Sequence, residues 1–211
     1  MKLHESNAIR WDCRHYLGDR PCAFNRTCHG CGHYSPHAER VCVVKFGALG
    51  DVIRTLCILP ELRRRYPDGQ ITWVTRAAAA KFIEAHPLID RVIVADSGQT
   101  ATLPHERFDL VIGLDKEPEP CALTAALTAD RKLGIGLSPA GTPAPLNAEA
   151  EAYFLLGLSD ELKFHENTKS YPRLIHEALG WRYRGQRYTL PVTESARRLV
   201  RDRKSTRLNS S

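Results

Sequence analysis

The fold of this chain is decided by the stretch VVKFGALGDVIRT, residues 43–55. The apolar run from Val41 to Phe46, interrupted only by Lys45, is typical of a strand covered on both faces of a parallel sheet. A loop from Gly47 to Gly50 follows. Beyond it, apolar side chains share one helical face: Val52, Leu56, Leu59, Leu62 and Tyr66. The stretch therefore predicts a strand, a glycine loop and a helix, with Pro60 bending the helix.

The same pattern recurs downstream. Further strands are expected at Ile71–Thr75, Arg91–Ala95, Asp109–Leu114 and Lys132–Leu137, and further helices at Ala77–Ala85 and Pro118–Ala129. Strands that alternate with helices indicate βαβ units with right-handed crossovers. We therefore predict an α/β fold over residues 41–192, a Rossmann-like doubly wound parallel sheet.

The last third of the chain is expected to be less regular. A loop rich in Pro and Gly runs to Pro145, and the later elements are expected as helices Ala148–Leu156, Thr168–Leu179 and Ser195–Arg203 and a short strand Gln186–Val192. Gly180 is placed to end the second of these helices. Residues 193–203 would start an inter-domain segment. The tail 204–211, with Leu208 as its one apolar side chain, is expected to be non-native.

Composition limits the class of protein. The chain has 211 residues, enough for one α/β domain and a small appendage. No apolar run approaches the ~20 residues that span a bilayer, and the N-terminus lacks a signal-peptide core. We therefore expect a cytoplasmic protein. Its net charge of +6 is spread along the sequence, which fits either a solvated surface or contact with anionic partners such as phosphorylated sugars, lipid head groups or nucleic acid.

The glycine loop is the best candidate site. Open α/β sheets bind ligands where a strand's carboxyl end meets the next helix. The loop lacks both G-x-G-x-x-G and the P-loop pattern, which argues against a dinucleotide or P-loop site. Asp51 could cap its helix or act as a general base. Arg54 and Arg76 follow the first two strands and suit oxyanions or a solvated surface.

Several segments resemble family 9 glycosyltransferases, the ADP-heptose:lipopolysaccharide heptosyltransferases and their relatives. The likeness covers roughly residues 41–200. It is carried by residues 43–55, 59–62, 66–67 and 71–74, and by HPLIDRV (86–92), LDKEP (114–118), GIGL (134–137) and NTKSY (167–171). The resemblance implies a GT-B fold, in which an N-terminal Rossmann-like domain holds the acceptor and a second domain holds the sugar nucleotide.

The resemblance also implies a function for the loop. Asp51 would be the catalytic base, and Gly47, Gly50, Arg54 and Arg76 would bind the acceptor. The reaction would be an inverting transfer of heptose or a similar sugar, from ADP-heptose or another nucleotide sugar, to a lipopolysaccharide-core-type glycolipid or sugar. No catalytic metal or obligate protein partner is expected, and the enzyme could touch the cytoplasmic face of the inner membrane.

The donor domain of that family would begin near residue 200, and the sequence runs to Ser211. We therefore expect a truncated, N-terminal half of the enzyme. Without a sugar-nucleotide site, the 211-residue chain is expected to be inactive by itself.

Four cysteines cluster in residues 1–40, a polar leader with no helical or strand period. Cys13, Cys22, Cys28 and Cys31 are separated by eight, five and two residues. The C-x-x-C pair is a common half-site for structural zinc, and a metal would stabilise a segment that has no core. His15, His29, His33 and His37 are competing ligands. An iron–sulfur cluster or unliganded thiols are the alternatives. Cys42, Cys57 and Cys121 lie in apolar runs and are expected in the core.

Two other functions remain open. A nucleotide-binding Rossmann protein, such as an oxidoreductase, would need a dinucleotide loop of a different type. A zinc-containing module that binds nucleic acid would need aromatic side chains interleaved with basic ones, and the leader has few aromatics. Nucleic acid is therefore not an expected partner.

Overall fold

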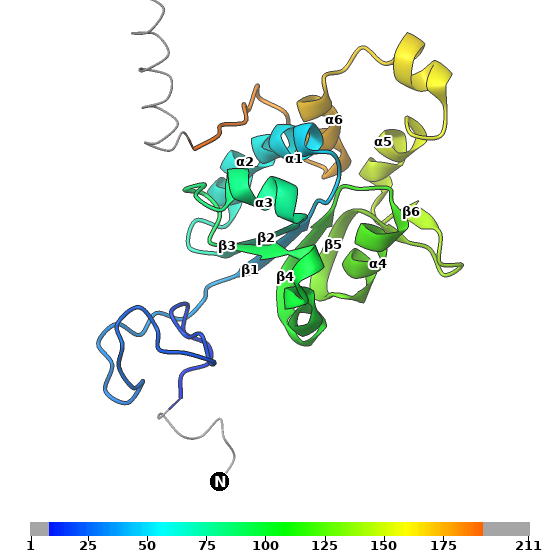
Figure 1. The fold of residues 1–211 in the computed structure, drawn as a ribbon. Coiled ribbons are helices and arrows are strands. Elements are labelled where there is room, and N and C mark those ends of the chain that lie inside the picture. Colours follow the sequence, from blue (N-terminus) through cyan, green and yellow to red (C-terminus); the bar gives the residue numbers. More distant parts are fainter. Residues whose placement is uncertain (1–8, 192–211) are drawn as a thin grey trace, which may run out of the picture.

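The computed structural model describes residues 9–191. Its centre is a six-stranded sheet in the order β3-β2-β1-β4-β5-β6 (Figure 1). The strands are β1 (Arg40–Val44), β2 (Gln70–Thr75), β3 (Arg91–Val94), β4 (Arg107–Gly113), β5 (Thr128–Leu137) and β6 (Pro143–Pro145). The first five pair in parallel, and β1 lies between β2 and β4. The predicted doubly wound α/β sheet is thus confirmed over these strands.

One strand departs from the predicted all-parallel sheet. β6 pairs antiparallel with β5 in a segment that the sequence predicts as loop, with Ile135 opposite Pro145 and Leu137 opposite Pro143. Proline cannot donate to a ladder, so a strand with a proline at each end is confined to a sheet edge. β6 occupies that edge.

Helices cover both faces of the sheet (Figure 1). They are α1 (Leu49–Thr55), α2 (Leu59–Arg65), α3 (Ala77–Ile83), α4 (Pro118–Ala126), α5 (Glu151–Leu155) and α6 (Tyr171–Ala178), with 3-10 segments η2 (Leu56–Ile58), η3 (Ala95–Ser97), η4 (Gln99–His105) and η5 (Ala148–Ala150), and a π-helical turn at Leu162–Glu166. Val41 and Val43 pack under α1 to α3 and α6, while Cys42 and Val44 face the side of η4 and α4. This alternation explains why β1 reads as continuously apolar.

Some predicted boundaries are wrong for local reasons. The single helix expected from Val52 to Tyr66 is divided into α1, η2 and α2, so the break precedes Pro60, which lies in the first turn of α2. Proline is tolerated there because its missing N–H has no helical partner in the first turn. The helix expected to end at Ala129 ends at Ala126, and β5 begins at Thr128.

In the C-terminal part of the described chain, one predicted element is confirmed and another is wrong. α6 ends in a Schellman motif: Gly180 has φ +68°, its N–H bonds the Glu177 carbonyl at 2.9 Å, and the Trp181 N–H bonds the His176 carbonyl at 2.8 Å. The expected strand over 186–192 is absent from its described residues, 186–191. Val192, the helix Ser195–Arg203 and the tail 204–211 lie outside the described residues.

The leader, residues 9–39, lies beside the sheet domain as a chain of turns (Figure 1). An isolated bridge between Cys13 and Pro36 ties its two ends together. Arg14 donates to the Asp68 carbonyl at 3.0 Å, which links the leader to the turn before β2. Over the part of the chain that the structure covers, we find no helix with the length and apolar character to cross a membrane.

Candidate functional site

A cavity of about 590 Å³ opens where the chain leaves β1 and β4. These two strands are neighbours, and the helices that follow them, α1 and α4, pack on opposite faces of the sheet. This is the topological switch point at which open α/β sheets bind ligands. The loops after both strands form one wall, and the segment from Tyr153 to Leu174 forms the other.

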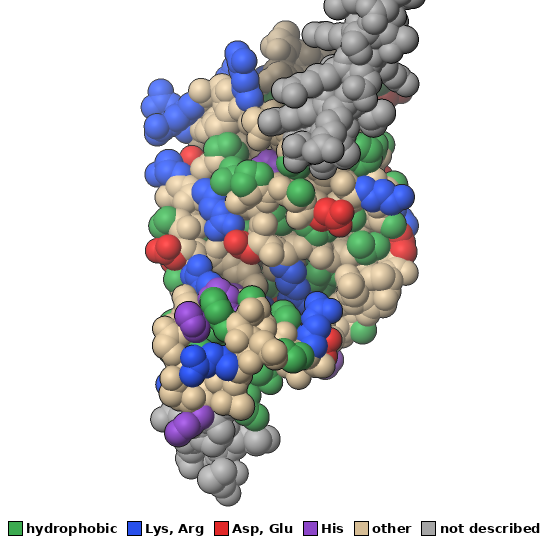
Figure 2. All heavy atoms as spheres, turned by 60° about the vertical axis from the view of Figure 1, so that its left-hand side comes forward, with side chains coloured by type: hydrophobic (Ala, Val, Ile, Leu, Met, Phe, Trp, Pro, Cys, Tyr) green, Lys and Arg blue, Asp and Glu red, His purple; other side chains and the backbone are tan. Residues whose placement is uncertain are grey.

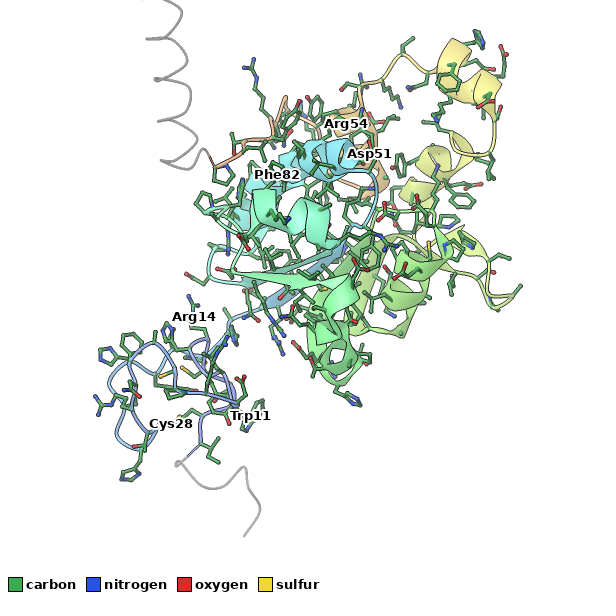
Figure 3. All side chains as sticks on the ribbon, viewed as in Figure 1. Trp11, Arg14, Cys28, Asp51, Arg54 and Phe82 are labelled. Atoms are coloured by element: carbon green, nitrogen blue, oxygen red, sulfur yellow. The ribbon has the colours of Figure 1, made fainter. Side chains whose placement is uncertain are left out.

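Asp51 lies on the rim of this cavity, in the first turn of α1. Its carboxylate forms an ion pair with Arg54, and its side chain is 38% exposed. Figure 3 shows both side chains on the same helix, far from Cys28 in the leader. Among the described residues, no side-chain hydrogen bond caps α1, whose N-cap residue is Ala48. Asp51 is therefore not the N-cap of α1, and its carboxylate pairs with Arg54 on the partly exposed wall of the cavity.

Arg54 connects Asp51 to α6. Its guanidinium lies 4.5 Å from the ring centre of Tyr171, and its hydrogen bond to Asp51 raises the pKa of Arg54. Thr55 donates its hydroxyl proton to the Asp51 carbonyl at 2.7 Å, so the Tyr171 hydroxyl, 3.0 Å away, is the donor to Thr55. These contacts hold the rim of the cavity against α6.

A buried ion pair lies beneath the glycine loop. Lys45 and Asp115 contact each other with side chains only 5% and 2% exposed. The Asp115 carboxylate also accepts hydrogen bonds from the backbone N–H groups of Phe46 and Gly47. Burial opposes the charge on Lys45, but Tyr171, Asp115 and Asp51 outweigh it and raise the pKa of Lys45. The pair therefore fixes the loop that precedes Asp51.

Of the four predicted acceptor-binding residues, the structure places two in the lining of the cavity. Gly47 lines the cavity, and a Cβ there would lie 2.7 Å from Lys45 Nζ and 2.9 Å from Asp115 Oδ1, so a larger residue would displace the ends of these two side chains. Arg54 also lines the cavity, but Gly50 and Arg76 do not. The Arg76 guanidinium instead bridges two acids, Asp96 at 3.1 Å and Glu119 at 2.5 Å. The acceptor roles of Gly50 and Arg76 stay predictions.

Three polar residues of the cavity were missed as site residues. Asp115 and Lys116 lie in the loop after β4, and Tyr171 begins α6. Their motifs, LDKEP and NTKSY, were visible in the sequence. A role could have been inferred from LDKEP only if the strand order were known, because only that order places the end of β4 beside the end of β1.

The four leader cysteines line one cavity of about 220 Å³, together with His15 and His33. Backbone N–H groups, chiefly that of Phe24, lower the pKa of Cys22. Among residues 9–191, however, no three His, Cys, Asp or Glu side chains are grouped closely enough to hold a metal ion. The donor set fits a thiolate metal site, but a bound metal would have to draw the thiols together.

The other three cysteines are core residues, as predicted. Cys42, Cys57 and Cys121 are buried free thiols. Burial raises the pKa of Cys57 to about 12 and that of Cys121 to about 11. These thiols are therefore protonated and packed rather than reactive.

The positive charge of the chain does not gather on the face drawn in Figure 2, where Lys and Arg side chains are scattered among apolar and uncharged ones. Many Lys and Arg side chains of residues 9–191, on whichever face they lie, form ion pairs. Examples are Arg63 with Asp90 and Arg107 with Asp130. A basic stripe of the kind that binds nucleic acid is thus absent from this face of the described residues.

Fold and cavity together define a doubly wound α/β domain with an acid at its switch point. No protein-family model matches the chain, and no curated protein matches it. Among solved structures, it is similar to a family 9 glycosyl transferase from Veillonella parvula, at 19% identity and a TM-score of 0.57, over 82% of this chain and 51% of that one. The chain therefore spans about half the length of that structure.

Two E. coli structures are also similar to the chain. Heptosyltransferase WaaC with ADP matches at 21% identity and a TM-score of 0.46, over 71% of this chain and 50% of that one. ADP-heptose lps heptosyltransferase II matches at 15% identity and a TM-score of 0.38, over 44% of this chain and 29% of that one. Both likenesses are too weak to support an argument. At the level of the fold, the likeness to the Veillonella structure confirms the expected resemblance to family 9 glycosyltransferases.

Proposed function

We propose that this chain is the acceptor-binding part of a family 9 glycosyltransferase, with Asp51 as the general base. One observation carries the proposal: Asp51 is partly exposed on the rim of a 590 Å³ cavity at the switch point of the sheet. The sequence motifs of residues 43–55 and the fold likeness to a family 9 glycosyl transferase support the family.

The chemistry follows from that position. An acceptor hydroxyl in the cavity would lose its proton to the Asp51 carboxylate as its oxygen attacks the anomeric carbon of a nucleotide sugar. The new C–O bond forms on the face opposite the leaving group, and the nucleoside diphosphate departs with the electron pair of the broken C–O bond. Arg54 would orient the carboxylate, and the buried Lys45–Asp115 pair would hold the loop that presents it.

The substrates are proposed from the family resemblance alone. The donor would be ADP-heptose or another nucleotide sugar, held by a second domain, and the acceptor a lipopolysaccharide-core-type glycolipid or a sugar. The enzyme would need no catalytic metal and would work in the cytoplasm, in contact with the inner membrane where its acceptor is a lipid.

The test is a transfer assay with the protein translated from the complete gene, in the presence of EDTA. ADP-heptose and core oligosaccharide acceptors are incubated with the protein, and products are identified by mass spectrometry. A product heavier by one heptose supports the proposal. Absence of transfer from every nucleotide sugar tried, with a folded protein, would refute it.

We also propose that the leader holds a structural zinc ion through Cys13, Cys22, Cys28 and Cys31. The support is that these thiols share one cavity in a segment held mainly by turns. Thiolates are the ligands that structural zinc prefers. The protein purified without chelator should contain one zinc per chain by elemental analysis, and a Cys28→Ser variant should lose it. Iron with a visible absorption band would indicate a cluster instead. A protein that contains neither zinc nor iron would refute the site.

A further inference from the structure

The cations that line the cavity beside Asp51 fall into two groups. Three of them are neutralised by a carboxylate: Lys45 by Asp115, Arg54 by Asp51 and Lys169 by Glu177. Lys116 and Lys163 also line the cavity, and neither forms an ion pair within residues 9–191. Glu117, an exposed residue of the same wall, is paired with neither of them in this part of the chain.

Lys116 is positioned by the end of α5. Its ammonium donates to the carbonyls of Tyr153 and Phe154, each at 2.9 Å, and lies 4.9 Å from the Tyr153 ring centre. An ammonium has three N–H donors, so one remains for a ligand. The Lys116 side chain can approach these carbonyls because residue 157 is glycine; a Cβ at Gly157 would overlap the lysine side chain. Lys116 is thus held in place with one donor unused by the described residues.

Lys163 reaches the same cavity from the opposite wall. It lies on the π-helical turn, and its ammonium is 4.8 Å from the Phe164 ring centre. Burial, and then the positive charge of Lys163, lower the pKa of Lys116 to about 8. Two like charges that face one cavity without a counterion are unfavourable. A bound anion would remove that cost.

We propose that Lys116 and Lys163 form a subsite for an oxyanion carried by the acceptor, either a phosphate monoester or a carboxylate. The inference rests on the proposed acceptor site and adds residues that set its specificity. Lysine binds such groups as a compact point charge with several donors. The subsite lies in the same cavity as Asp51, so an anion held there would place the rest of the sugar near the base.

The other reading of Lys116 is that it only caps α5, since lysine often binds the last carbonyls of a helix. Lys163 separates the two readings. Lys163 is exposed, and its side chain forms no hydrogen bond to residues 9–191; only its backbone N–H is bonded, to the Ser159 carbonyl in the turn. Its loss should therefore not disturb α5. Under the capping reading, a change at Lys163 has no effect on anion binding.

The experiment measures binding of inorganic phosphate, glucose 6-phosphate, glucuronate and methyl glucoside to the 211-residue chain by NMR titration. The variants are Lys163→Gln and Lys116→Met, with Lys81→Gln on the exposed surface of α3 as the matched control. We expect Lys163→Gln to weaken phosphate binding about fivefold, as for one charge near a surface. Lys116→Met should weaken it further, and Lys81→Gln should change it less than about twofold.

The outcomes separate the two proposals. A subsite is supported if glucose 6-phosphate or glucuronate binds more tightly than methyl glucoside and loses that advantage in Lys163→Gln; the better probe identifies phosphate or carboxylate. Equal binding of charged and neutral sugars, or an equal loss in Lys81→Gln, would overturn the subsite while the sugar site stands. If phosphate binding depends on both lysines but no sugar improves it, the subsite stands and the acceptor-binding function fails.

Discussion

Replacing Asp115 by alanine should destabilise the domain more than any surface change. The substitution leaves the Lys45 ammonium, 5% exposed, without its partner. Breaking a buried ion pair from one side costs about 3–5 kcal/mol. The N–H groups of Phe46 and Gly47 also lose their acceptor, but this cost overlaps with the first, so we expect about 4 kcal/mol in total.

The assay is urea denaturation followed by circular dichroism. With a slope of about 2 kcal/mol per M, a loss of about 4 kcal/mol lowers the midpoint by about 2 M. The double variant Lys45→Met/Asp115→Leu removes the unpaired charge and should recover about half of the loss. Asp130→Ala is the matched surface control, because its partner Arg107 is 75% exposed and such pairs contribute about 0–1 kcal/mol.

The reasoning is refuted if Asp115→Ala costs no more than Asp130→Ala. That result would mean that the acid is either solvated or unnecessary to the loop before Asp51. A double variant as unstable as Asp115→Ala would show instead that the lost backbone acceptor, not the unpaired ammonium, dominates.

Three further predictions use pH and one glycine. Sulfate binding by the wild-type chain should weaken as pH rises through about 8, where Lys116 loses its proton. The Lys116→Met variant should bind sulfate weakly at every pH. A wild-type affinity for sulfate that does not change with pH would contradict the prediction. Hydrogen bonds from Arg64 and then Arg65 lower the pKa of Glu61 to about 2. The stability that the Glu61 carboxylate contributes is therefore present above its usual pKa of 4.5 and lost as pH falls toward 2. The difference in urea midpoint between wild type and Glu61→Gln should shrink over that range, and a constant difference would exclude the linkage. Gly180→Ala should cost about 1 kcal/mol because φ is +68° at that position, and an unchanged thermal midpoint would argue against the motif.

The sequence predicted the parts of the fold that depend on local patterns. β1, the glycine loop and the helix that carries Asp51 follow from the periodicity of residues 41–55, since strand and helix periods are read within a short window. The role of Asp51 as a base is implied only by the family resemblance. The predicted ends of helices and strands near proline residues were less accurate. The break before Pro60 and the edge strand β6, between Pro143 and Pro145, both required knowledge of which N–H groups have partners.

The cavity itself could not be predicted, because its walls are far apart in the sequence. Lys45 meets Asp115 across 70 residues, and Thr55 meets Tyr171 across 116. Those contacts depend on the strand order, which no local pattern encodes. The leader was predicted from cysteine spacing alone, and the structure adds that its four thiols share one cavity.

The central claim is that Asp51 removes the proton from the acceptor hydroxyl. It is tested most directly by comparing Asp51→Asn with wild type in the protein translated from the complete gene, measuring both the transfer rate and the acceptor Kd. Asn keeps the shape of the side chain but cannot accept the proton. We expect the rate to fall about 10²- to 10⁴-fold with little change in Kd, and the surface variant Asp68→Asn to behave as wild type. A variant at Asp51 that transfers sugar at the wild-type rate would contradict the account.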